Sequence, residues 1–245
     1  MARCRLLCFP WAGGSAASYQ GWSRFLPEDV ELWLVTPAGR EPRHDEPEAE
    51  RADAYVAAVT AAVLERPAMP LTLFGHSFGG LMAYETALRL TAATRIPTRL
   101  IVSACPVPGR LSIDADTDRL PDPQLVALIR ERFGGLPAGL EESPEFLALV
   151  LHRIRADLRL MQQCSAGPRP LLPVPISVFW SPEDRSVTEH VVSPWAARST
   201  HGATFHTFEG GHFFVSAQAD AVTACIASLL RDDLDVSPRR AAVTR

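Results

Sequence analysis

The segment Leu71–Gly80 reads LTLFGHSFGG, and its interpretation decides how the rest of the chain is understood. Its first half is mainly apolar, as in a strand that is buried on both faces, and an Ala- and Leu-rich stretch of helical length follows it. Between them, Gly75, Ser77 and Gly79 form the pattern G-x-S-x-G. A sharp strand-to-helix turn exposes a serine hydroxyl, and the flanking glycines let neighbouring backbone pass closely. The segment therefore predicts that Ser77 is a nucleophile.

Apolar runs alternate with stretches of helical length along most of the 245 residues, which is typical of a parallel sheet covered by helices. The predicted strands are Arg5–Phe9, Glu31–Thr36, Leu71–Gly75, Leu100–Ala104, Ile176–Trp180 and Thr204–Phe208. Helices are predicted at Ala52–Glu65, Gly80–Thr91, Pro194–Ser199 and Ala217–Arg231. We expect one α/β domain over residues 1–231. The polar, charged residues 232–245 are predicted to form a disordered tail.

Residues 107–173 break this alternation, because no convincing strand lies among them. Two amphipathic helices are predicted instead, at Pro123–Phe133 and Pro144–Cys164, separated by the breaker Gly134-Gly135-Leu136-Pro137. One apolar face gathers Leu125, Leu128, Ile129 and Phe133, and the other gathers Phe146, Leu147, Val150, Leu151, Ile154 and Leu158. A helical insertion after a central strand favours a lid over a site. An extra helical layer packed on the sheet is the alternative.

Composition sets several functional classes aside. The net charge of −4 gives no basic field for nucleic acid or anionic lipid, and all 24 cationic side chains are arginines. The apolar runs are shorter than the roughly 18–20 residues of a membrane span, and no signal peptide is recognisable. Five scattered cysteines without a CxxC pair favour reduced thiols in the cytoplasm over disulfides or a zinc site. No metal or cofactor is expected.

A serine nucleophile needs a base, and the base needs an orienting acid. His212 follows the predicted strand Thr204–Phe208 in the segment EGGHFF, just before the last helix. Asp184 follows the strand Ile176–Trp180, which gives the chain order serine, acid, histidine. Glu183 is adjacent and remains the alternative acid. The end of the preceding strand offers no carboxylate before Asp114.

Two backbone amides are expected to form an oxyanion hole. One belongs to Phe78, after the nucleophile, and the other to Ala12 in the glycine-containing turn that follows the first strand. Among the other histidines, His76 is interpreted as a packing or hydrogen-bonding neighbour inside the turn. Ordinary surface or lid positions are expected for the rest, namely His44, His152, His190, His201 and His206. No spacing among them supports a metal site.

The combined motifs resemble those of type II thioesterases, the free-standing editing enzymes of polyketide and nonribosomal peptide assembly lines. The resemblance spans about residues 4–230. Its motifs are Cys8–Ser15 (CFPWAGGS) with Tyr19 and Trp22, Gly39-Arg40-Glu41 with Arg43 and Glu46-Pro47, Leu73–Gly79, Leu136 and Pro137, Arg155–Leu158, Pro175-Ile176, Asp184, Trp195, and Gly210–Phe214. It implies an α/β-hydrolase fold with a helical lid, and it also favours Asp184 over Glu183. The sequence departs from the family at Ala38 before Gly39-Arg40, at Trp180-Ser181-Pro182, and at Phe78, where methionine is common and a bulkier ring could narrow the acyl pocket.

This resemblance implies a serine thioesterase that releases acyl groups from the phosphopantetheine arms of acyl or peptidyl carrier proteins. The protein is expected to be a monomer without nucleic-acid or membrane partners. Carrier proteins are acidic, so docking by Arg40, Arg43 and the arginines of the lid is a hypothesis. A carboxylesterase or lipase acting on oxygen esters is the main alternative. A macrocyclising thioesterase and a catalytically inactive binding module are further alternatives.

Overall fold

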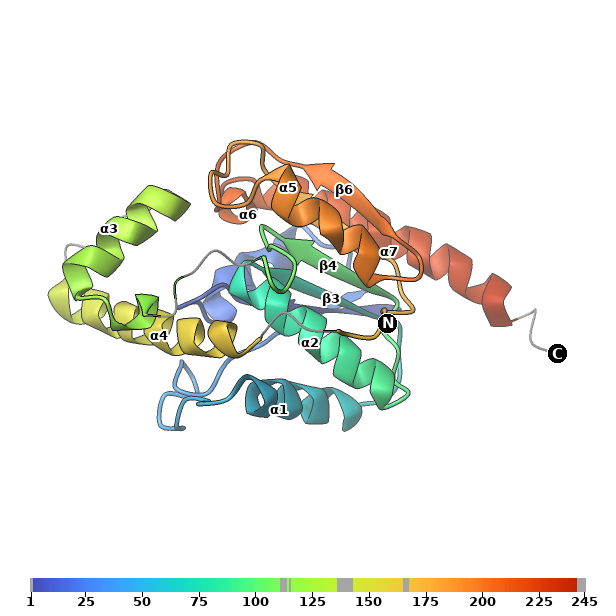
Figure 1. Ribbon diagram of the computed structural model, residues 1–245. Coiled ribbons are helices and arrows are strands. Elements are labelled where there is room, and N and C mark those ends of the chain that lie inside the picture. Colours follow the sequence, from blue (N-terminus) through green and yellow to red (C-terminus); the bar gives the residue numbers. More distant parts are fainter. Residues whose placement is uncertain (1, 111–113, 115, 136–142, 165–167, 242–245) are drawn as a thin grey trace.

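A computed structural model describes residues 2–110, 114, 116–135, 143–164 and 168–241, with side chains as far as Asp235 (Figure 1). Leu136 and Pro137 of the predicted breaker lie outside the described residues. Within them, no helix is long and apolar enough to cross a membrane. The five cysteines all lie in described segments and form no disulfide.

Six parallel strands form one sheet in the order β2-β1-β3-β4-β5-β6. They are β1 (Cys4–Phe9), β2 (Val30–Leu34), β3 (Leu71–His76), β4 (Arg99–Ser103), β5 (Ile176–Trp180) and β6 (Ala203–Thr207). The α/β fold and all six predicted strands are confirmed. Because every pair is parallel, all six carboxyl ends meet at one edge of the sheet, where ligands bind in open α/β folds.

Helices bury both faces of the sheet. Along β1, Leu7 and Phe9 join one core while Leu6 and Cys8 join the other, as expected for side chains that alternate across a strand. The first core is covered by α1 (Ala52–Leu64) and α2 (Phe78–Ala92), with α5 (Glu189–Val192) and the 3₁₀ helix η4 (Ser193–Arg198). The second is covered by the 3₁₀ helix η1 (Ala16–Arg24), α6 (Phe214–Ala217) and α7 (Ala219–Ala241). Burial on both faces explains the near-continuous apolar runs of the strands.

The short helices η1, α5 and α6 were absent from the sequence-based prediction, as was the single 3₁₀ turn η2 (Thr117–Arg119). They are too short to produce a helical repeat of apolar residues. For η1 a local signal exists, because Ser15 and Ser18 form a capping box around its first turn. The predicted helix at Pro194–Ser199 is the 3₁₀ helix η4.

Helices α3 (Asp122–Phe133) and α4 (Pro144–Gln163) lie together beyond one end of the sheet (Figure 1). A single 3₁₀ turn, η2 (Thr117–Arg119), precedes them. Ser143 caps α4, and Pro144 occupies its first turn, where a missing amide proton costs nothing. Both helices match the predicted ranges closely, and the described part of 107–173 holds no strand.

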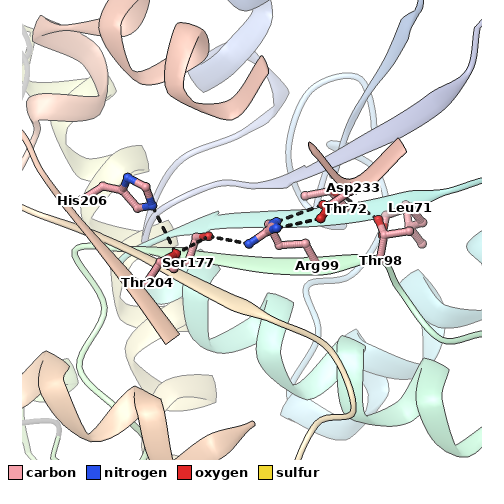
Figure 2. Close-up of polar contacts among 8 residues, drawn as sticks. All are labelled: Leu71, Thr72, Thr98, Arg99, Ser177, Thr204, His206 and Asp233. Carbon is pink, nitrogen blue, oxygen red and sulfur yellow. Dashed lines mark hydrogen bonds and ion pairs between the residues drawn. The ribbon is translucent and has the colours of Figure 1, made fainter. Parts of the chain in front are cut away.

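The prediction of disorder from residue 232 is wrong for residues 232–241, because α7 continues to Ala241. Arg99, at the start of β4, is 8% exposed and needs a partner. Asp233 supplies it, with Nη2–Oδ1 and Nε–Oδ2 distances of 2.6 and 2.9 Å. Figure 2 shows this pair, with Arg99 also donating to Ser177 Oγ at 3.0 Å. The extra turns of α7 therefore neutralise a nearly buried charge. Residues 242–245 lie outside the described chain.

The Arg99–Asp233 pair gives a stability prediction. Asp233→Asn leaves the guanidinium without its counter-charge, and we expect a loss of about 2–3 kcal/mol in the free energy of unfolding. The neighbouring Asp232 is exposed, so Asp232→Asn is a matched control that should change stability by less than about 0.5 kcal/mol. Urea unfolding of both variants measures this. Equal stability of the two would contradict the role given to the pair.

Candidate active site

Ser77 joins β3 to α2 through a strained turn. Its φ of 56° and ψ of −121° place a non-glycine residue in a region that costs about 1–3 kcal/mol. Two hydrogen bonds hold the turn: the Ser77 amide donates to Ser103 O at 2.7 Å, and the Gly80 amide donates to Ser77 O at 2.9 Å. The strain therefore points to function at Ser77.

The glycines on either side of Ser77 are required by close backbone contacts. A Cβ atom on Gly75 would lie 2.1 Å from the carbonyl oxygen of Gly79. A Cβ on Gly79 would lie 2.2 Å from the carbonyl oxygen of Phe9. Neither contact can be relieved by turning a side chain. The G-x-S-x-G pattern thus encodes a turn in which β1, β3 and α2 meet backbone to backbone.

His212 and Asp184 come together from the ends of β6 and β5. The turn after β6 uses positive φ at Gly210 and Gly211, and it places His212 Nδ1 2.7 Å from Asp184 Oδ2. His212 is 5% exposed and Asp184 is 3% exposed. Glu183, in contrast, is exposed. The structure therefore pairs Asp184, and not Glu183, with His212.

Ser186 also holds the Asp184 carboxylate, although sequence reasoning missed it. Its hydroxyl and amide donate to Asp184 Oδ1 at 2.6 and 2.9 Å, and its Oγ lies 3.2 Å from His212 Nδ1. The spacing Asp-x-Ser is the available signal, because an aspartate commonly accepts a hydrogen bond from the amide two residues on.

The Asp184 carboxylate is kept ionised. Burial alone would raise its pKa, but hydrogen bonds from His212 and Ser186 and the attraction of His212 lower the pKa below its ordinary value. An ionised carboxylate facing Nδ1 assigns the proton of the neutral imidazole to that nitrogen. The Nε2 atom of His212 is then the basic one, as a general base requires.

A cavity of about 630 Å³ opens at the carboxyl edge of the sheet and is lined by both Ser77 and His212. Helices α3 and α4 form much of its wall, through Leu125, Leu128, Ile129, Phe133, Phe146, Val150, Ile154 and Leu158. Leu147 and Leu151, from the same predicted face of α4, pack into the core. The two apolar faces in the sequence therefore form one apolar chamber, which suits an apolar chain.

Two aromatic side chains, Phe133 and Phe78, line this cavity together with Ser77 and His212. The ring of Phe133, at the end of α3, lies 4.7 Å from the ring of His212 between centroids. Phe78, the residue that departs from the family pattern, also lines the cavity and lies edge to face against Tyr55 at 6.1 Å. The residues 107–173 thus contribute directly to the surroundings of His212.

The turn after β1 carries Ala12, Gly13 and Gly14 into the same cavity. The Gly13 amide donates to Asp157 Oδ2 at 2.7 Å, and the Gly14 amide donates to Trp11 O at 2.9 Å. Phe78 opens α2, where an amide has no acceptor within the helix. Ala12 and Phe78 therefore stay the predicted oxyanion donors, and both line the cavity.

The hypothesis that Arg40 docks an acidic partner is wrong, because its side chain is 2% exposed. Its Nη2 atom lies 2.6 Å from Asp157 Oδ2, and Nη1 donates to Gly14 O. Arg153 of α4 is 7% exposed in its side chain and pairs with Glu41 at 2.8 Å. Arg43 remains accessible at 42% and binds Glu46. An arginine in a sequence motif can thus be an internal partner instead of a surface charge.

His76 is fully buried beside the site, as predicted for a packing neighbour. Its Nδ1 lies 2.9 Å from Ser103 Oγ, and its ring is 5.2 Å from that of His212. Burial, together with the charge of His212, lowers the pKa of His76 well below its ordinary value. The imidazole is therefore neutral at physiological pH.

The remaining histidines lie away from the cavity. His44, His152, His190 and His201 are exposed, in line with the prediction, and His206 is half-buried with its ring 5.2 Å from that of Phe179. Among the residues the structure describes, no group of three or more His, Cys, Asp or Glu side chains could hold a metal ion.

Gly79→Ala tests the backbone contact at the nucleophile turn. The added methyl group meets the Phe9 carbonyl, so we expect at least about 3 kcal/mol of destabilisation and loss of Ser77 reactivity. Gly21→Ala is the control, because its methyl group would lie 3.4 Å from the end of the flexible Arg24 side chain. Thermal unfolding and labelling of Ser77 by a fluorophosphonate are the measurements. A Gly79→Ala protein as stable and reactive as the control would refute the packing argument.

The lowered pKa of His76 predicts how the stability of the protein depends on pH. Unfolding returns this imidazole to water, where its pKa is about 6.5, so the unfolded chain takes up a proton below that pH. This uptake lowers the free energy of unfolding by about 1 kcal/mol between pH 7.5 and pH 5.5. His76→Gln abolishes this contribution, and the variant should lose less stability over that interval. Urea unfolding at pH 7.5, 6.5 and 5.5 compares the two, and equal losses would rule out a neutral buried His76.

The thioesterase domain family model matches residues 4–230. The chain is 33% identical over 236 residues to the AMB antimetabolite synthetase AmbE of Pseudomonas aeruginosa, covering 95% of this chain and 11% of that protein. It is 32% identical to a probable cadicidin biosynthesis thioesterase of Streptomyces griseus, covering 94% of this chain and 63% of the relative. The solved structure of BorB, the type II thioesterase from the borrelidin biosynthetic cluster, superposes with a TM-score of 0.80 at 31% identity, covering 93% and 91% of the two chains. The chain belongs to the thioesterase domain family.

Proposed function

We propose that this protein is a serine thioesterase that hydrolyses acyl thioesters from the phosphopantetheine arms of acyl or peptidyl carrier proteins. The observation that carries the proposal is the hydrogen bond between Asp184 and His212, at an apolar cavity that His212 and the strained Ser77 both line. Membership of the thioesterase family and likeness to a type II thioesterase from a biosynthetic cluster support this substrate class.

The proposed reaction has two halves. His212 Nε2 takes the proton of Ser77 as Oγ attacks the thioester carbonyl, and Asp184 stabilises the imidazolium. The amides of Phe78 and Ala12 bind the oxyanion. The imidazolium returns its proton to the departing thiolate, which leaves an acyl group on Ser77. His212 then activates a water molecule, and its attack releases the carboxylic acid and restores the serine.

The α3–α4 pair is proposed to act as a lid over the acyl chain. Its apolar residues line the cavity, and the Phe133 ring contacts that of His212. A thiolate is already a good leaving group, so admission of the acyl chain beneath this pair is the step at which substrates are selected. An enzyme of this kind would edit stalled or aberrant acyl groups on polyketide or nonribosomal peptide assembly lines.

Two further features belong to this proposal. The protein acts as a monomer in the cytoplasm, where its five unpaired cysteines would stay reduced. The chemistry uses only protein groups and water. An accessible arginine such as Arg43 remains available to meet an acidic carrier, whereas Arg40 is buried.

Ser77→Ala tests the nucleophile. The substitution removes the attacking oxygen, so turnover of a carrier-bound acyl thioester should fall by about 10³- to 10⁶-fold. Near-normal hydrolysis by the variant would reject Ser77 as the nucleophile.

The same assay decides the substrate class. We expect kcat/KM for one acyl group to be highest on a carrier protein, lower on free pantetheine, and lowest as a p-nitrophenyl oxygen ester. A clear preference for the oxygen ester, with no gain from the carrier protein, would favour a carboxylesterase or lipase instead.

A further inference from the structure

A buried ion pair joins Asp157 of helix α4 to Arg40 of the segment after β2, and both side chains hydrogen bond to the turn that carries Ala12. We infer that Arg40 and Asp157 are positioning residues, which hold the turn that carries Ala12 in the place where its amide can bind the oxyanion. Because Asp157 belongs to α4, the α3–α4 pair then contributes to catalysis as well as to the wall of the cavity. The inference rests on the proposed function, because it assigns these residues to the same oxyanion hole. Neither side chain lines the cavity that holds Ser77 and His212, so neither is assigned a contact with substrate.

The Arg40–Asp157 pair makes two hydrogen bonds to the turn that carries Ala12. Asp157 Oδ2 accepts the Gly13 amide at 2.7 Å, and Arg40 Nη1 donates to the Gly14 carbonyl. The peptide unit that contains the Gly13 nitrogen also contains the Ala12 carbonyl. The Ala12 amide lies in the preceding peptide unit, whose Trp11 carbonyl accepts the Gly14 amide at 2.9 Å. Fixing Gly13 and Gly14 therefore restrains the peptide units on both sides of Ala12 and, with them, the direction of the Ala12 amide.

Helix α4 also packs directly against the turn that carries Ala12 and Gly13. Ile154 and Asp157 are three residues apart, so they lie on the same face of the helix. A Cβ atom on Gly13, whose φ is +78°, would lie 2.6 Å from Ile154 Cγ1. The turn is thus held by packing against Ile154 and by the hydrogen bond that its Gly13 amide donates to Asp157, and both residues lie in one helical turn of α4.

A contribution to stability alone does not account for the pair. Each side chain is only 2% exposed, and their charges are 2.6 Å apart at Nη2 and Oδ2. Removing two charges from water offsets most of their attraction, and apolar residues of similar volume commonly serve as well for stability. Apolar residues could not hydrogen bond to the Gly13 amide and the Gly14 carbonyl. What the ion pair provides, and apolar residues could not, is a fixed position for the turn.

Two variants test this role. Asp157→Asn removes the charge, and the double variant Arg40→Met/Asp157→Leu removes both charges without leaving one unpaired. We expect kcat for a pantetheine thioester to fall by about 10- to 100-fold in each, since the Ala12 amide is displaced but not deleted, while KM stays within about threefold. Affinity for an alkyl boronic acid, whose tetrahedral adduct with Ser77 occupies the oxyanion hole, should fall by a similar factor.

Asp233→Asn is the matched control for a purely structural effect. It breaks an arginine–carboxylate pair with two hydrogen bonds, shown in Figure 2, in which Arg99 is the first residue of β4 and so lies at the amino end of the strand. This control should lower the unfolding temperature yet leave kcat and boronate affinity within about twofold of wild type. Folded Asp157 variants that behave like the control would overturn the positioning role.

Two measurements keep the test decisive if a variant fails to fold or the substrate class is wrong. Exchange of the Gly13 amide proton in the wild-type protein should be slow because Asp157 accepts it, and exchange at the rate of a free amide would overturn the inference. The rate of Ser77 phosphonylation by a fluorophosphonate should fall in the Asp157 variants whatever the natural substrate. A wild-type protein that reacts with this probe but hydrolyses no thioester would refute the proposed function and leave the positioning test intact.

Discussion

The close approach of three backbone segments at Ser77 is the constraint on which the rest of the site depends. The carbonyl of Phe9, at the end of β1, occupies the space where a Gly79 side chain would lie, and Gly79 in turn excludes a side chain from Gly75. The turn after β1 and the first residues of α2 are therefore brought against each other. Ala12 and Phe78, the predicted oxyanion donors on these two segments, line the same cavity as Ser77.

The parallel sheet brings the remaining groups to the same edge. Asp184 follows β5 and His212 follows β6, so their hydrogen bond joins neighbouring strand ends. Helix α4 approaches from outside the sheet and is tied to the β1 turn by the Arg40–Asp157 pair. Strand ends thus supply the reactive groups, and the α3–α4 pair supplies the apolar surroundings and a brace for the turn.

Most of what could be predicted from the sequence is encoded by local patterns. Apolar runs predicted the strands, and the motif with its chain order predicted that Ser77, Asp184 and His212 belong to one site. Contacts between residues far apart escaped prediction. Arg40 was assigned to the surface because no local pattern reveals Asp157, and residues 232–241 were assigned to a tail because Arg99 lies more than a hundred residues from Asp233. Ser186 was missed although its spacing from Asp184 is a local signal.

In the proposed mechanism, Ser77 carries the acyl group between the two halves of the reaction. Rapid quenching of the protein with an acyl-pantetheine thioester, followed by mass spectrometry of the intact chain and its peptides, tests it most directly. We expect a mass increase equal to one acyl group, located on Ser77 and lost as the free acid appears. Steady thioester hydrolysis without acylation of Ser77, or an acyl group on another residue that turns over at the same rate, would contradict it.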